Sequence, residues 1–270
     1  MTSPATAGWS RGIIRAPVNM DPSILYQDSD LIAVSKDSGE PVIPTGGGPR
    51  DACLHRRLEA QIGARLWVVH RLDREASGLV VFARSAEAHR ALSMAFEHRE
   101  VEKHYVAFAL GALPADSGEL DVALHDARRG KTRPAEPGEP GAREAATHYV
   151  VRRRWRRGGH DVLLVNLRPQ TGRRHQIRVH LRAAGAPILF DPLYGRAMPR
   201  EIFEGAPCSR LALHARRLVL PRLTGLKPCA TADGPEPSGS RLLLEAPLAP
   251  DLVELGRWLN ASWSVEPLSS

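Results

Sequence analysis

Cysteine is scarce in this chain, and long apolar runs are missing. The three cysteines, Cys53, Cys208 and Cys229, are odd in number and widely spaced, with no Cys-x-x-Cys pair. This usage argues against a disulfide framework or a structural zinc site and favours reduced thiols. No stretch approaches the roughly 18 apolar residues of a membrane span, and the N-terminus lacks a signal-peptide segment. We therefore expect a soluble protein of the cytoplasm.

Signals for nucleotide triphosphates and for metal ions are missing as well. The three glycines at 46–48 lack the Lys-Ser/Thr of a phosphate-binding loop. His175 and His180 are five residues apart, which suits neither one helix face nor alternate strand positions. No carboxylate cluster suggests a pair of metal ions, so a metal-dependent nuclease has little support. We expect neither a metal nor a cofactor.

Positive charge is present in excess. The chain has 37 lysines and arginines against 30 acidic residues, for a net charge of +7. This balance favours a polyanionic partner such as nucleic acid, although arginine-rich composition alone is weak evidence. The arginines cluster at 128–129, 152–157 and 168–182. Their clustering predicts a basic face in the middle of the chain.

Apolar patterning predicts that sheet dominates the first third of the chain. Short buried strands are expected at residues 31–34, 67–69 and 79–83, and a further strand at 105–110. Ser85 is placed to cap a helix, because the residues that follow recur at helical spacing. The apolar positions of that helix are Ala88, Leu92 and Ala95.

Residue patterns in the second half of the chain predict further strands and two helices. Residues 147–155 and 161–167 alternate around Gly158-Gly159, as in an antiparallel hairpin. Residues 242–244 are expected to form a strand, and Asp251 to cap a short helix. That helix would bury Leu252, Leu255 and Leu259. Residues 126–146 and 222–240 are expected to be long loops, the first of them functional.

Two segments combine residue types suited to chemistry on an anion. Residues 70–79 place Asp73 between two arginines, immediately ahead of an apolar strand. Residues 167–181 pass from a strand through a glycine turn into a predicted helix. There Arg174, Arg178 and Arg182 are expected to share one face. Each segment alone has a plainer interpretation, because a lone aspartate in a turn usually caps backbone and a basic helix face is usually solvated.

Together with Lys103-His104-Tyr105, these segments resemble the RluA-type family of RNA pseudouridine synthases. That family carries His-Arg-Leu-Asp followed by Ser-Gly-Leu, and a Thr-Gly-Arg…His-Gln-Ile-Arg-Val-His stretch. The similarity extends from about residue 25 to residue 259, including 186–195 and 211–215. The combined match is far more specific than either segment alone.

The chain departs from the family pattern at three positions. Ala76 stands where the family usually has Thr, and Asp37 follows Lys36 where Pro is usual. Phe190 replaces the usual Gly before Asp191, which implies an altered turn or an added apolar contact. Neither Ala76 nor Asp37 touches the proposed chemistry directly, and the change at Phe190 bears on substrate shape rather than on reaction class.

The resemblance implies an α+β fold, with a mixed, mostly antiparallel sheet, flanking helices and a central RNA-binding cleft. We expect residues 21–270 to form one catalytic domain and residues 1–20 a flexible extension. No separate S4-type RNA-binding module is expected, because about 20 residues cannot fold one. A site contained in one domain makes a monomer the simplest expectation.

The resemblance also implies that Asp73 is the catalytic aspartate, Tyr105 the tyrosine beside the target base and Arg178 the partner of the aspartate. Isomerisation breaks the N1 bond to C1′, turns the uracil and joins C5 to C1′, without redox change. An ionised carboxylate can attack C1′ or remove the C2′ proton, and Arg178 would favour the ionised form. Tyr105 offers a ring to stack on the extruded uracil and a hydroxyl near C5, where a proton must leave after the new bond forms.

RNA contacts are expected from the basic residues around these segments. Arg71 is expected to help extrude the base, since flipping costs a few kcal/mol that other contacts must offset. The remaining predicted contacts are Arg128, Arg129, Lys131, Arg173, Arg174 and His175. The target is a structured RNA, with transfer RNA slightly favoured over ribosomal RNA. The alternative is an RNA-binding or folding factor in which catalysis is secondary or lost. Only the departures from the family pattern at Ala76 and Phe190 support it.

Overall fold

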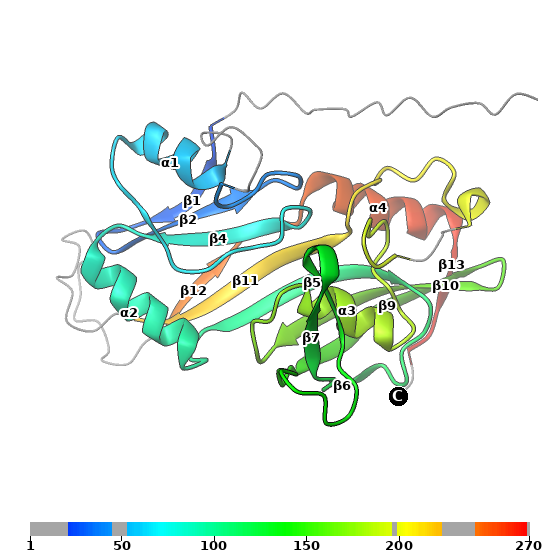
Figure 1. The fold of residues 1–270 in the computed structure, drawn as a ribbon. Helices are drawn as coiled ribbons and strands as arrows, with labels where there is room; N and C mark the ends of the chain where they lie inside the picture. The colour runs from blue at the N-terminus through cyan, green and yellow to red at the C-terminus, as the bar shows by residue number, and fades with distance from the viewer. Residues whose placement is uncertain (1–20, 45–52, 196–198, 223–240, 269–270) are drawn as a thin grey trace, which may run out of the picture.

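The computed structural model describes residues 21–44, 53–195, 199–222 and 241–268. One eleven-stranded sheet runs through these residues (Figure 1). Its main path is, in order, β1 (Ser23–Gln27), β2 (Leu31–Lys36), β4 (Ser77–Ala83), β11 (Leu213–Pro221), β5 (Glu102–Leu110), β10 (His160–Pro169), β9 (Thr147–Arg157) and β13 (Ser264–Glu266). Three short strands extend it: β3 (Trp67–Val68) beside β4, β12 (Arg241–Glu245) beside β11 and β6 (Ser117–Leu120) beside β9.

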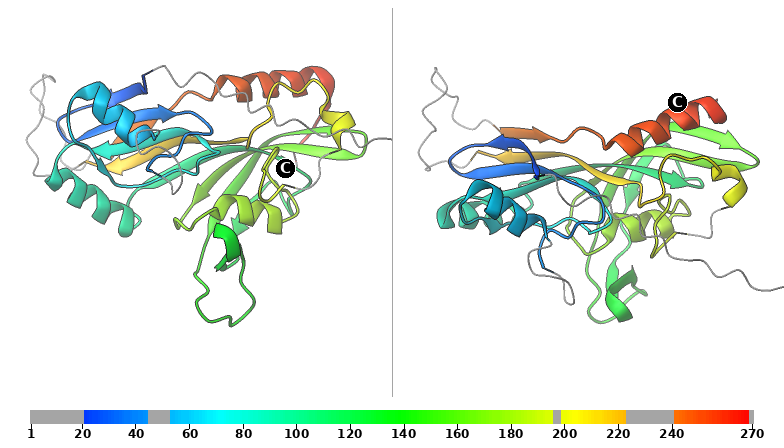
Figure 2. Two further views of the ribbon diagram at one scale, coloured as in Figure 1. Left: turned by 45° about the horizontal axis from the view of Figure 1, so that its top comes forward. Right: turned by 90° about the horizontal axis from the view of Figure 1, so that it is seen from above.

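Four α-helices and two short 3-10 helices accompany the described part of this sheet. They are α1 (Leu54–Ile62), α2 (Ala86–Glu97), α3 (Gln176–Ala183), α4 (Pro250–Ser262), η1 (Arg128–Gly130) and η2 (Arg200–Phe203). A separate hairpin consists of β7 (Leu124–Ala127) and β8 (Lys131–Pro134). Figure 2 shows α4 on one side of the sheet and α3 with this hairpin on the other. Over the described residues, no helix is long and apolar enough to cross a membrane.

The strands predicted in the first third of the chain are apolar at successive positions, without the usual alternation of apolar and polar residues. The reason is that helices cover both faces of the sheet in this region. All seven residues of β4 are buried. Side chains of a strand point alternately to its two faces. Leu79 and Val81 join a cluster with α2, whereas Val80 and Phe82 join a cluster with α1. The two helices therefore cover opposite faces of the same strands.

Several local predictions are confirmed. Ser85 caps α2, since its hydroxyl accepts a hydrogen bond from the Ala88 amide at 3.0 Å. The Gly158-Gly159 turn joins β9 to β10, and both glycines have positive φ, 56° and 77°. Such angles fit the primed turns that connect antiparallel strands. The fold class predicted from the sequence, a mixed and mostly antiparallel sheet with flanking helices, is also confirmed.

One row of residues across the sheet brings the three sequence segments together. Gly78 of β4 pairs with Ala215 of β11, Ala215 pairs with Tyr105 of β5, and Tyr105 pairs with Leu167 of β10. The first of these pairings is parallel, unlike the others in the described sheet. Gly78 has φ 116°, and a Cβ there would lie 2.3 Å from the Ala215 carbonyl oxygen. Glycine is therefore required for this close approach, which sets the Asp73 segment beside Tyr105.

Two predictions about secondary-structure elements, one on a loop and one on a helix cap, were wrong. Residues 126–146 were expected to be a loop, but they include most of the β7–β8 hairpin, which buries Leu124 and Thr132. Asp251 does not cap α4, because the helix begins at Pro250. Its carboxylate instead accepts two hydrogen bonds from Arg210, both at 2.7 Å. One of its oxygens also accepts from the Leu252 amide at 3.0 Å, so Asp251 contacts the first turn from inside the helix while it pairs with Arg210.

Some predictions lie outside the described residues. They concern the extension at 1–20, the glycines at 46–48, Cys229 and most of the loop at 222–240. Cys53 and Cys208, which are described, are buried and form no disulfide.

Candidate active site

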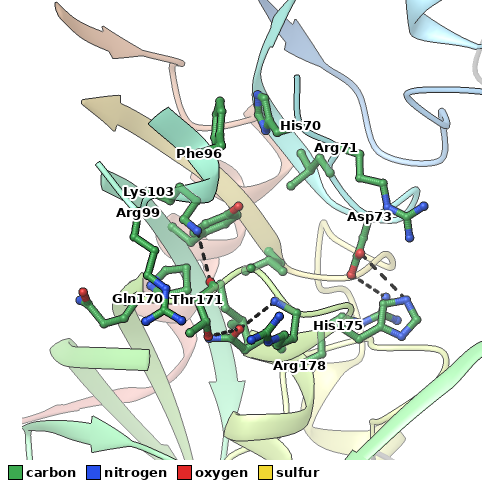
Figure 3. Close-up of a pocket in the computed structure, with 18 of the residues that line it drawn as sticks. His70, Arg71, Asp73, Phe96, Arg99, Lys103, Gln170, Thr171, His175 and Arg178 are labelled. Carbon is green, nitrogen blue, oxygen red and sulfur yellow. Dashed lines mark hydrogen bonds and ion pairs between the residues drawn. The ribbon is translucent and has the colours of Figure 1, made fainter. Parts of the chain in front are cut away.

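A pocket of about 650 Å³ opens where the sequence segments meet (Figure 3). Its walls come from the loop before β4, the end of α2, the start of β5 and the connection between β10 and α3. Asp73, Tyr105 and Arg178 all line it. The structure thus brings the three predicted catalytic residues into one pocket, while their chemical roles stay predictions.

The pocket contains an aspartate paired with a fully buried arginine. Arg178 Nη1 donates to Asp73 Oδ2 at 3.1 Å and to Glu75 Oε2 at 3.3 Å. The Arg178 side chain has no exposed surface, whereas the Asp73 side chain is 24% exposed. A ligand in the pocket can therefore reach the carboxylate without disturbing the guanidinium behind it.

Asp191 fixes the orientation of Arg178. Its two oxygens accept from Arg178 Nε at 2.9 Å and Nη2 at 2.8 Å. The amides of Leu193 and Tyr194 also donate to Asp191, at 2.8 and 3.1 Å. This bidentate pair uses one edge of the planar guanidinium and leaves Nη1 facing Asp73.

The charge states of this pair follow from its environment. Burial alone would lower the pKa of Arg178, but hydrogen bonds and the charges of Asp191 and Asp73 raise it above its usual value. Burial alone would raise the pKa of Asp191, but Arg178 and two backbone amides hold it below its usual value. Both groups are therefore charged at neutral pH.

The three arginines predicted on one helix face are separated instead. Arg174 precedes α3 and is exposed, and Arg182 is exposed near the end of the helix. Only Arg178 points inward, with its whole residue 1% exposed. The prediction failed because α3 begins later than expected and is buried nearly all round. A buried helix accommodates one arginine where carboxylates neutralise it.

The turn ahead of α3 is locked by a single amide side chain. Gln176 Oε1 accepts from the Thr171 hydroxyl at 2.7 Å and from the Arg173 amide at 3.0 Å. Gln176 Nε2 donates to the Ala146 carbonyl at 2.9 Å. Because these bonds tie the turn to the sheet, they set the direction in which α3 leaves it.

Tyr105 lies partly buried in the pocket on β5. Burial, and to a smaller extent the negative charge of Asp73, raises the pKa of its phenol. The hydroxyl therefore keeps its proton at neutral pH. It can donate or accept a hydrogen bond there, and its ring offers an apolar surface.

Lys103 and Arg99 also line the pocket, although no role was predicted for either from the sequence. Lys103 Nζ donates to the Thr171 carbonyl at 3.2 Å. Burial and the charge of Arg99 lower the pKa of Lys103. Lys103 could have been predicted as a site residue because it lies two residues before Tyr105. No sequence motif surrounds Arg99, and its positive φ of 62° is known only from the structure.

Glu75 and Asp191 were also missed as site residues, although both belong to segments that carried the resemblance. Lys36 supports the site from outside the pocket. Burial lowers its pKa to about 8. Its amine donates to the carbonyls of Asp37, Glu40 and Arg74, at 2.7, 2.8 and 3.1 Å. Lys36 thereby ties β2 to the backbone next to Asp73.

His70 supports the pocket wall rather than binding a metal. Its Nε2 accepts from the Val81 amide at 2.9 Å, and its ring stacks on Phe96 with the centroids 4.7 Å apart. Burial, with a smaller effect from Lys103, lowers the pKa of His70 to about 4. The ring is therefore neutral at neutral pH. Among the described residues, no group of His, Cys, Asp or Glu side chains could hold a metal ion.

The predicted RNA-contacting residues are distributed around two hollows. Arg71 is exposed and Arg173 half-buried at the main pocket. A second hollow of about 310 Å³ lies against the β7–β8 hairpin and is lined by Lys131, Arg173 and Arg174. Arg128 is exposed in η1. The side chain of Arg129 lies outside what the structure describes.

His175 differs from the other predicted RNA contacts because it is buried, with 8% of its surface exposed. Its Nε2 lies 3.9 Å from Asp73 Oδ1, and its Nδ1 lies 2.8 Å from the Tyr194 hydroxyl. Figure 3 shows His175 and Arg178 on the side of the pocket facing Asp73. Its position suits contact with Asp73 better than contact with an RNA phosphate.

Phe190 keeps the backbone conformation that a glycine would adopt. Its φ is 58°, in the left-handed region. Its ring packs edge-on against Phe203, with the centroids 5.6 Å apart. Of the two outcomes expected for this departure, the structure shows the added apolar contact.

Comparison with known proteins gives consistent matches. The family model described as RNA pseudouridylate synthase matches residues 30–183. Ribosomal large subunit pseudouridine synthase D of Xanthomonas campestris pv. campestris is 34% identical over 242 residues, covering 86% of this chain and 71% of the relative. The tRNA pseudouridine synthase C of Haemophilus ducreyi is 35% identical over 208 residues, covering 74% of this chain and 85% of the relative.

A solved structure supports the fold. The human RNA pseudouridylate synthase domain containing 4 superposes with a TM-score of 0.69 at 24% identity, covering 92% of this chain and 95% of that one. The curated relatives differ in length. Five of them, including the Xanthomonas synthase, are spanned by this chain over 54% to 71% of their length, and four of the five over less than two thirds.

Proposed function

Because this chain belongs to the RluA-type family of RNA pseudouridine synthases, its activity is the isomerisation of uridine in RNA, and we propose that Asp73 is its catalytic aspartate. One observation carries the proposal: the buried guanidinium of Arg178 presents Nη1 to a partly exposed Asp73 at 3.1 Å, inside a pocket. The guanidinium places its positive charge directly against the carboxylate that the reaction uses.

Asp73 can serve the reaction in either of two ways. Its carboxylate attacks C1′ as the N1 bond breaks, or it removes the C2′ proton to give a glycal. Arg178 donates to Oδ2, so Oδ1 keeps its lone pairs for the substrate. In both schemes the uracil turns and C5 then joins C1′. In that step the carboxylate leaves C1′ in the first scheme and returns the proton to C2′ in the second. The proton on C5 passes to water, and N1 gains a proton. No electrons are gained or lost, so the reaction needs no cofactor.

Tyr105 acts on the base. Its phenol keeps its proton, because burial raises its pKa, so the hydroxyl works as a hydrogen-bonding group and not as a phenolate base. The ring stacks on the extruded uracil, as aromatic rings do in RNA recognition. Arg178 has a second role, since it compensates the charge of Asp73 in a site from which the base excludes water.

The RNA is held by cations on either side of the pocket. Arg71 is exposed at its rim, where it can occupy the gap left by the extruded base. Lys131, Arg173 and Arg174 line the second hollow and are suited to backbone phosphates. The relatives' names cover ribosomal and transfer RNA, and we propose that the substrate is a structured RNA of one of these two classes.

The experiment is a tritium-release assay, because the C5 proton must leave in every turnover. The substrate is total RNA labelled at C5 of uridine, from a strain in which the gene is deleted. We expect Asp73→Asn to lower release at least about 1,000-fold. Glu254→Gln makes the same chemical change on α4, on the far side of the sheet, and should match the wild-type protein. Undiminished release by Asp73→Asn would refute the assignment.

We further propose that the enzyme acts as a monomer in the cytoplasm, with residues 21–270 as one catalytic domain. Asp73, Tyr105 and Arg178 meet in one pocket within this chain, so no residue of a second copy is needed to bring them together. Sedimentation at the concentrations used for the assay tests it, and a stable dimer would contradict it.

A further inference from the structure

A row of buried polar groups links the β7–β8 hairpin to Asp73. The Thr132 amide of β8 donates to the Tyr194 hydroxyl at 2.8 Å. That hydroxyl lies 2.8 Å from His175 Nδ1, and His175 Nε2 lies 3.9 Å from Asp73 Oδ1. Thr132, Tyr194 and His175 are 4%, 3% and 8% exposed. Buried polar groups arranged in this way act as a unit, because each one fixes the orientation of the next.

The charges around His175 determine which ring nitrogen carries the proton. Nε2 faces the Asp73 carboxylate, and a lone pair there would repel it, so Nε2 carries the proton. Nδ1 is then an acceptor, and the Tyr194 hydroxyl donates to it while accepting from the Thr132 amide. At 3.9 Å the contact with Asp73 is longer than a hydrogen bond and acts through the dipole of the N–H group.

The ring is neutral at neutral pH. Burial has the largest effect and lowers the pKa of His175. The negative charge of Asp73 opposes it, the charges of Arg178 and Arg174 lower the pKa further, and Glu75 has a smaller opposing effect. His175 therefore contributes an oriented N–H group, while Arg178 contributes the full positive charge.

The backbone of His175 is held in an unusual conformation. Its φ is 53°, in the left-handed region, at the residue before α3. Side chains other than glycine adopt this region rarely and at a cost of about 1–3 kcal/mol. His175 lines the pocket in this conformation, and an outlier of this kind at a site points to a role there.

We propose that His175 is a positioning residue for the isomerisation, and that Tyr194 and Thr132 orient it from the hairpin. Arg178 holds Oδ2 of Asp73 and His175 faces Oδ1, so together they set the plane of the carboxylate. The hairpin that lines the basic hollow thereby also orients a group at the catalytic aspartate. This inference rests on the proposed role of Asp73.

The first test removes the hydroxyl of Tyr194. Tyr194→Phe keeps the ring, over which the Arg178 guanidinium lies 5.2 Å from the centroid. We expect kcat in the tritium-release assay to fall roughly 10- to 100-fold, as for small displacements of a reacting group, with KM within about twofold. Tyr149→Phe is the matched control: it removes the hydroxyl of another buried tyrosine, on β9, which lines neither hollow, and should leave kcat unchanged.

The second test compares two replacements of His175. Asparagine tolerates the left-handed backbone better than glutamine does. Glutamine, however, is long enough to place an N–H group where Nε2 lies. A positioning role predicts a higher kcat for His175→Gln than for His175→Asn, whereas a purely conformational role predicts the reverse order. Thermal unfolding of both variants separates loss of activity from loss of fold.

The outcomes separate this inference from the assignment of Asp73. Wild-type kcat in Tyr194→Phe, or His175→Asn equal to or better than His175→Gln, would overturn the positioning role and leave Asp73 as the catalyst. Activity retained by Asp73→Asn would instead overturn the assignment on which the inference rests.

Discussion

The two sides of the pocket are constructed differently. On one side Asp73 stands on a loop, 24% exposed and held mainly through one contact with Arg178. On the other side Arg178 has no exposed side-chain surface and makes two hydrogen bonds to Asp191, which is itself buried. The exposed group is placed to react, and the buried group is fixed by several contacts. Substitutions on the two sides should therefore affect different properties.

The sharpest test of this comparison is a pair of variants. Arg178→Met leaves Asp191 buried without its partner, and we expect it to lower the free energy of unfolding by about 3–5 kcal/mol. Asp73→Asn removes a partly exposed carboxylate, and we expect its unfolding free energy to stay within about 1 kcal/mol of wild type. Urea denaturation of both variants measures the difference. Equal losses would mean that the two sides are not distinct.

A double variant sharpens the same point. Arg178→Met combined with Asp191→Leu removes both buried charges, and replacing a buried ion pair by apolar groups is often neutral for stability. We expect it to recover most of the stability lost in Arg178→Met without recovering activity. If activity returned with stability, Arg178 would serve the fold alone.

A pH experiment tests another buried polar contact, which joins the paired strands β4 and β11. His214 is 1% exposed, and its Nδ1 lies 2.9 Å from the Ser77 hydroxyl. Burial, with a smaller effect from Arg210, lowers the pKa of His214 from 6.5 to about 4. Because the folded-state pKa is the lower one, the unfolded chain binds a proton first as the pH falls. The stability present above pH 6.5 is therefore lost toward pH 4.

For this contact between β4 and β11 we predict an effect on the free energy of unfolding. Between pH 7 and pH 4.5 the wild-type protein should lose about 2 kcal/mol more unfolding free energy than His214→Gln does. Urea denaturation at the two pH values measures both losses. Parallel losses in the two proteins would show that His214 does not titrate as its burial implies.

The smallest expected effect lies outside the pocket. Lys131 is exposed at the basic hollow, so Lys131→Ala should raise KM for RNA a few-fold, leave kcat unchanged and reduce the salt slope of binding by about 1. Arg257→Ala, which removes an exposed cation on α4, is the control. A change in kcat instead of KM would place Lys131 closer to the chemistry than the structure does.

The sequence predicted the elements whose signals are local. The Ser85 cap of α2 and the Gly158-Gly159 hairpin depend on residues within one turn of each other, so their patterns are complete in the sequence. The core positions of α4 were also predicted, although its cap was not. Asp251 found a stronger partner in Arg210, 41 residues away along the chain.

What the sequence could not supply are contacts between distant segments. The clamp of Asp191 on Arg178 and the contact of Glu75 with the same guanidinium join residues 13 and 103 positions apart. The pairing of Gly78 with Ala215, and of Ala215 with Tyr105, depends on the order of the strands in the sheet. The spacing of apolar residues does not encode that order. Residues 126–146 looked like a loop because Gly, Pro and charge hide the alternation of a short hairpin. The candidate residues were predicted from the resemblance to a family, whereas the distances and contacts between them are known only from the structure.

The most direct test of the catalytic assignment is made in cells. Pseudouridines would be mapped in total RNA, by carbodiimide treatment and reverse transcription, from strains with the gene intact, deleted or carrying Asp73→Asn. We expect the same sites to disappear in the deleted and Asp73→Asn strains, which would also identify the RNA. Sites that disappear on deletion but persist with Asp73→Asn would contradict it.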